Sequence, residues 1–111
     1  MRDNIRQDIR IILNDIKCSP EYREYLRTRS IVKADEKLKL RAEEARRELL
    51  RLAELNPAES DPYMGQMELA ERMPEVLEYG PIRDYLRADA DFCRLIREIT
   101  DFLIDGLEFE A

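Results

Sequence analysis

The sequence predicts an all-α protein: an elongated antiparallel bundle of four to five helices with a long C-terminal helix. Charged residues make up 40% and hydrophobic residues 44% of the chain, which suits helices with one buried stripe and a wide hydrated face. Only three of the 111 residues are Gly, which disfavours a β-rich fold with many tight turns. Apolar residues recur at three- and four-residue spacings. The length is that of a single domain, residues 1–111.

The first helix is predicted over Asp3 to Lys17. Its apolar face consists of Ile5, Ile9, Ile12, Leu13 and Ile16. Ser19-Pro20 ends this helix and starts the next, because Ser is a good N-cap and Pro suits the first helical position. The second helix carries Tyr22, Tyr25, Leu26 and Val32 on one side.

Asp35 is the expected cap of a third helix that reaches about Leu55. Its apolar residues follow an alternating four-three spacing that resembles a short coiled-coil seam: Leu38, Ala42, Ala45, Leu49 and Leu52. Residues 56–62, with two prolines and several turn-forming residues, predict a loop.

A fourth helix is expected to follow, and Pro74 should kink or restart it. Its predicted inward side chains are Tyr63, Met64, Met67, Ala70 and Met73. The final helix should run from Pro81 to about Asp105, with Gly106 as its stop. Its apolar stripe is Ile82, Tyr85, Phe92, Ile96, Ile99 and Leu103.

The final helix is long for a domain of this size. Its 25 residues would span about 37 Å, whereas a compact domain of about 100 residues has a radius of gyration of about 13 Å. The helix should therefore run the length of the molecule or protrude. Its broad apolar band predicts burial against another subunit, so we expect a homodimer or higher homo-oligomer.

The residue inventory argues against most enzyme and cofactor chemistry. The chain has no His, which removes the commonest general base and metal ligand, although carboxylates and thiols remain. Cys18 and Cys93 fit no metal-binding spacing; we expect reduced core thiols, with a redox or inter-subunit role as the alternative. No enzyme activity, catalytic residue, metal or cofactor is therefore predicted. Without a signal-like or membrane-spanning segment, the expected location is the cytoplasm.

Charge is divided unevenly along the chain. Residues 1–53 carry 14 Lys and Arg against 10 Asp and Glu, a net +4, and residues 54–111 carry 5 against 15, a net -10. The basic stretch around Lys33 to Arg51 is interrupted by glutamates and has no aromatic residues for base stacking. We expect a solvated helix face there and no direct nucleic-acid binding. The asymmetry fits halves that pack together, or docking with a basic partner or a second copy.

Two segments carry a family resemblance: Ser-Pro-Glu-Tyr-Arg-Glu-Tyr at 19–25, and Pro-Ile-Arg-Asp-Tyr-Leu at 81–86 followed by Phe92-Cys93-Arg94-Leu95-Ile96-Arg97-Glu98-Ile99. In this order, around a charged central helix and a proline-containing loop, the chain resembles the bacterial YlbF/YmcA family with its YheA-like members. The resemblance implies an all-α, self-associating regulator. It also implies partners among other family members or RNase Y, whose RNA processing some members modulate. Cys-rich-tailed members carry iron–sulfur clusters, and this chain shows no such tail.

The candidate interface residues are Tyr22, Tyr25, Met64, Met67, Tyr85, Phe92, Ile96, Ile99 and Leu103. For the tyrosines and methionines, core packing is the favoured alternative. Asp89 falls on the apolar stripe of the last helix, and we expect it to be exposed near the bundle end, with an Arg partner across the bundle or across a dimer seam as the alternative.

The sequence therefore favours a non-enzymatic regulatory adaptor that binds other proteins. Two other classes stay open. One is a structural or chaperone-like helical dimer, and the other is a small all-helical mutase that binds an anionic substrate with Arg and Lys. The acidic second half makes the mutase the less suitable reading.

Overall fold

The computed structural model describes residues 1–55 and 62–107, and these fold into six helices with no strand. The helices are α1 (Asp3–Lys17), α2 (Pro20–Lys33), α3 (Glu36–Leu55), α4 (Pro62–Arg72), α5 (Pro74–Leu77) and α6 (Gly80–Gly106). The predicted all-α fold with a long C-terminal helix is confirmed. The sixth helix arises because Pro74 starts a separate four-residue helix. The predicted loop at residues 56–61 and the tail at 108–111 lie outside the described residues.

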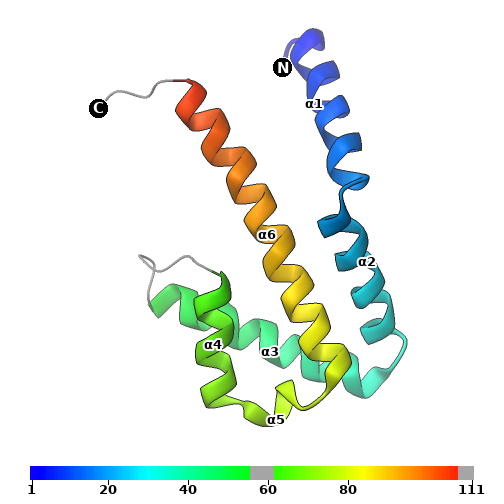
Figure 1. Ribbon diagram of the computed structural model, residues 1–111, viewed down its shortest axis with the longest axis vertical. Coiled ribbons are helices and arrows are strands. Elements are labelled where there is room, and N and C mark those ends of the chain that lie inside the picture. Colours follow the sequence, from blue (N-terminus) through cyan, green and yellow to red (C-terminus); the bar gives the residue numbers. More distant parts are fainter. Residues whose placement is uncertain (56–61, 108–111) are drawn as a thin grey trace.

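The molecule consists of a packed base from which two helical arms extend (Figure 1). α1 and α2 follow one another in nearly the same direction, and α6 returns antiparallel to them. α3 crosses the base, with α4 and α5 beside it. The extents of 47 × 34 × 20 Å and the radius of gyration of 16.5 Å describe an elongated shape, since a compact chain of this length would have a radius of gyration of about 13 Å.

Local signals in the sequence set the helix starts. Ser19 caps α2: its Oγ accepts a hydrogen bond from the Tyr22 backbone N–H at 3.2 Å and donates to the Ile16 carbonyl at 2.5 Å. Asp35 caps α3 by accepting from the N–H groups of Lys37 and Leu38 at 2.9 and 3.3 Å. These side chains satisfy N–H groups that the first turn leaves unpaired. Gly106 is the last residue of α6 and not the residue after its end.

The core lies in the base, where α2, α3, α4, α5 and the first half of α6 meet. Its buried side chains are Val32, Ala42, Ala45, Leu69, Val76, Ile82, Tyr85 and Leu86. The predicted seam of α3 is confirmed, with all five residues buried or half-buried. Thr28, which the pattern did not single out, is buried, and its hydroxyl donates to the Glu24 and Tyr25 carbonyls.

Three packing predictions were wrong. Met64 and Met67 point to solvent because α4 turns a different side toward α3 and α6, and only Met73 packs at the core edge. Cys18 and Cys93 are exposed and free, since Cys18 ends α1 away from the base and Cys93 lies where α6 leaves it. Asp89 is not simply exposed: its side chain is 18% accessible and lies 3.9 Å from Arg46 of α3.

Candidate interaction surfaces

Two helical prongs leave the base without touching each other. The α1 prong is Asp3–Lys17, and the α6 prong is the outer part of α6, residues 93–107. Within the described chain, α1 contacts α2 and no other helix, and the two prongs stand apart in Figure 1. Neither prong therefore covers the other within the described chain.

The α1 prong has an apolar face that nothing in the described chain buries. No residue of α1 is buried, and Ile5, Ile9, Ile12 and Leu13 are 40–47% exposed. Only Ile16, next to α2, is half-buried. The predicted amphipathic helix is confirmed, but its apolar face does not contribute to the core. Apolar side chains gathered on one helix face normally mark a contact surface.

The α6 prong continues an apolar stripe that starts in the core. Tyr85 and Phe92 pack inside the base, and Ile99 follows on the same face because a spacing of seven residues is nearly two helical turns. Beyond the base the exposure rises, to 55% at Leu103 and 80% at Phe102. The same helix therefore serves as core at one end and as an open surface at the other.

Charged residues flank these stripes in a complementary way. At 3.6 residues per turn, Arg6, Arg10 and Lys17 lie along one edge of the α1 stripe, while Asp8 and Asp15 lie along the other. On the α6 prong, Glu98 and Asp105 lie on one side of the helix together with Arg94, which pairs with Glu98 at 3.2 Å. Interleaved edges of this kind specify orientation and partner in helix–helix contacts.

An aromatic cluster fixes the root of the prongs. The Phe92 ring lies 5.3 Å, centroid to centroid, from both Tyr22 and Tyr25, and Tyr25 lies 5.9 Å from Tyr85. Such pairs add about 0.5–1.5 kcal/mol each beyond area burial. The cluster joins α2 to α6; Tyr85 belongs to the core and Tyr25 packs against it, while Tyr22 is half-buried.

A polar network lies beside this cluster. The Arg46 guanidinium donates to the Tyr85 hydroxyl at 3.1 Å and pairs with Asp89. Burial raises the pKa of Asp89, and Arg46 opposes this shift only in part. Burial also raises the pKa of the Tyr85 hydroxyl and of the Cys93 thiol. The network fixes α3 against α6, and the raised pKa of Cys93 keeps its thiol protonated and poorly nucleophilic.

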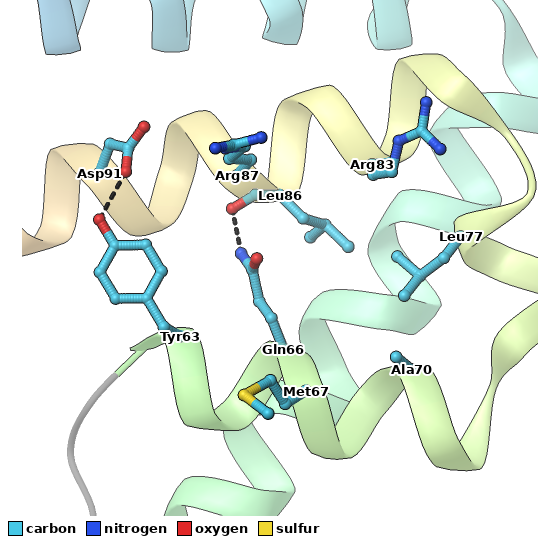
Figure 2. A pocket seen from close by; sticks show the side chains of 9 residues that line it. All are labelled: Tyr63, Gln66, Met67, Ala70, Leu77, Arg83, Leu86, Arg87 and Asp91. Atoms are coloured by element: carbon cyan, nitrogen blue, oxygen red, sulfur yellow. Dashed lines mark hydrogen bonds between the residues drawn. The ribbon is translucent and has the colours of Figure 1, made fainter.

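A groove of about 480 Å³ runs between α4 and the first half of α6. We call it the α4–α6 groove; its lining is Tyr63, Gln66, Met67, Ala70, Leu77, Arg83, Leu86, Arg87 and Asp91 (Figure 2). The Gln66 amide donates to the Leu86 carbonyl, and the Tyr63 hydroxyl donates to Asp91 at 2.5 Å. These two bonds tie α4 to α6 and fix the floor of the groove.

The structure divides the predicted interface residues among three places. Tyr22, Tyr25, Tyr85 and Phe92 form the aromatic cluster. Met64 and Met67 are exposed on α4, and Ile96, Ile99 and Leu103 line the α6 prong. The α1 face and the arginines of the groove were missed. The regular spacing of the isoleucines could have identified the α1 face as a contact surface. No sequence pattern distinguished the arginines of the groove.

Other site classes find no support in the described ranges. Among residues 1–55 and 62–107, no group of three or more Cys, Asp or Glu side chains is arranged to hold a metal ion. None of the helices in these ranges is long and apolar enough to cross a bilayer.

Comparison with known proteins identifies the family of the chain. The family model described as control of competence regulator ComK, YlbF/YmcA, matches residues 5–108. No curated protein and no solved structure matches the chain.

Proposed function

The chain belongs to the YlbF/YmcA family, and from that premise we propose that it is a non-enzymatic regulatory adaptor that acts in the cytoplasm through protein–protein contact. The observation that carries the proposal is the pair of uncovered apolar faces on the α1 and α6 prongs. The family is named for a regulatory role, which fits a protein that works by binding other proteins. Apolar faces that a monomer leaves open are the usual sites of such recognition.

We propose a second copy of the chain as the first occupant of these faces. The α1 stripe of one copy would pack on the α6 prong of the other, with Arg6 and Arg10 beside Glu98 and Asp105. In a two-fold dimer this contact occurs twice. The arginines beside the α1 stripe and the carboxylates of the α6 prong support the pairing of unlike prongs.

The family resemblance implies a complex that modulates RNase Y-dependent RNA processing, with other family members as further subunits. We assign no single residue to contact with RNase Y.

Affinity capture of the tagged protein from its native cytoplasm, with RNase treatment as a control, tests the adaptor. The expected result is RNase-insensitive recovery of other family members or RNase Y, and loss of these proteins in the Ile9→Glu/Ile12→Glu variant. The matched control is Ile11→Glu, because Ile11 is 57% exposed on another side of the same helix. Recovery of no specific protein would contradict the adaptor role.

A structural or chaperone-like dimer is the second candidate, because exposed amphipathic prongs can also hold unfolded clients. Such a protein would suppress aggregation of unrelated denatured proteins and would recover many of them in the capture. A single defined set of captured proteins would argue against it.

A further inference from the structure

Two arginines stand out in the acidic half of the chain. Of its five cations, Arg72 pairs with Glu48 and Glu68, and Arg94 pairs with Glu98. Arg83 and Arg87 make no ion pair or side-chain hydrogen bond with any described residue. They are exposed on successive turns of α6 and line the α4–α6 groove. A pair of unpaired cations beside a groove, in a half with net charge -10, presents a local site for negative charge.

The groove also offers an apolar contact. Met67 is 65% exposed, and Ala70 and Leu77 beside it are half-buried. Figure 2 shows Met67 on α4 and both arginines on α6, and all three line the groove. Flexible thioethers adapt to apolar side chains of a partner. The surface therefore combines one adaptable apolar edge with one cationic edge.

We propose that the α4–α6 groove binds an acidic amphipathic helix of a partner protein. The helix would lay its apolar side on Met67, Ala70 and Leu77 and direct carboxylates at Arg83 and Arg87. A groove with an apolar side between two helices is a recurring receptor for a third, amphipathic helix. No described residue offers a sheet edge that could bind an extended peptide instead.

The groove fits a protein better than a nucleic acid. Its one aromatic residue, Tyr63, has the Arg94 guanidinium over its ring at 5.9 Å from the centroid, whereas single-stranded nucleic acids bind on open aromatic rings. The groove lies in the base, away from the prongs, so this inference goes beyond the proposed self-association and can fail independently of it.

The test uses a fluorescent 15-residue helical peptide with Leu at positions i, i+4, i+7 and i+11 and Glu at most others. Fluorescence anisotropy measures its binding to the full chain and to Arg83→Glu/Arg87→Glu. Exposed ion pairs contribute up to about 1 kcal/mol each, and charge reversal replaces two such pairs by repulsion, so binding should weaken about tenfold. Lys33→Glu/Lys37→Glu, an equal charge change on exposed residues outside the groove, should leave binding unchanged.

Met67→Glu should also weaken peptide binding, since it removes the apolar contact and adds a like charge. Sedimentation velocity on the same samples should give an unchanged self-association constant for every groove variant. The inference is overturned by absent binding, by equal loss in the Lys33/Lys37 control, or by tighter binding of a peptide with Lys in place of Glu. It is also overturned by tighter binding of a single-stranded 12-nucleotide RNA, or by a changed self-association constant, which would assign the groove to the homodimer.

Discussion

Truncation of one isoleucine on the α1 stripe should weaken self-association without destabilising the base. Ile12 is 40% exposed and belongs to a helix with no buried residue. Ile12→Ala removes three carbons, each worth about 0.8 kcal/mol on full burial. Since 40% of the side chain remains to be covered, the loss is about 1 kcal/mol per copy. A two-fold dimer contains the change twice, so the dissociation constant should rise about 30-fold.

The matched control is Ile11→Ala, which makes the same chemical change one residue away on another side of α1. Ile11 is 57% exposed, and its loss should leave the dissociation constant unchanged. Sedimentation equilibrium over a range of concentrations measures both constants. Thermal melts at low concentration should show equal stability of the base in both variants. Equal weakening by the two substitutions, or no weakening by Ile12→Ala, would refute the assignment of the stripe as the contact face.

Three further changes probe the base and the junction. Leu69→Ala should lower the free energy of unfolding by about 2–5 kcal/mol, because Leu69 is 0% exposed; a chemical denaturation midpoint equal to wild type would contradict this packing. Ser19→Ala should lower it by about 1 kcal/mol through loss of the α2 cap, and Ser19→Asp should restore it in the same assay. Asp89→Asn should give a melting temperature at pH 7 equal to or above wild type. The folded-state pKa of Asp89 is raised, so ionisation of this carboxyl opposes folding above its ordinary pKa; the difference should shrink as pH falls toward 4, and marked destabilisation at pH 7 would show that the pair with Arg46 outweighs burial.

Helix positions could be read from the sequence because their causes are local. Ser19, Pro20 and Asp35 act on residues two to three positions away, and the α1 and α3 boundaries agree with their predicted places. The regular four-three spacing of apolar residues along α3 was also sufficient to identify its buried side, because these residues all fall on one face of the helix. Amphipathicity in α1 was equally clear in the sequence.

The sequence could not predict which element packs on each apolar face, because this depends on how the helices cross in space. α3 turns across the base instead of lying along α1, so the α1 stripe remains open. The contact between Arg46 and Asp89 joins residues 43 positions apart; the sequence offered an Arg partner only as an alternative, because no local pattern identifies which Arg faces Asp89. Arg83 and Arg87 follow the polar side of α6, which from sequence is indistinguishable from an ordinary hydrated face.

The isolation of α1 has a consequence for the lifetime of the protein. A helix of 15 residues whose only contact in the described chain is with α2 is marginally stable in water, so the helicity of α1 depends on occupation of its apolar stripe. When the concentration falls below the dissociation constant of the dimer, the first 17 residues should spend much of their time unfolded and open to proteases. A complex that keeps the stripe covered would then also determine how long each copy survives.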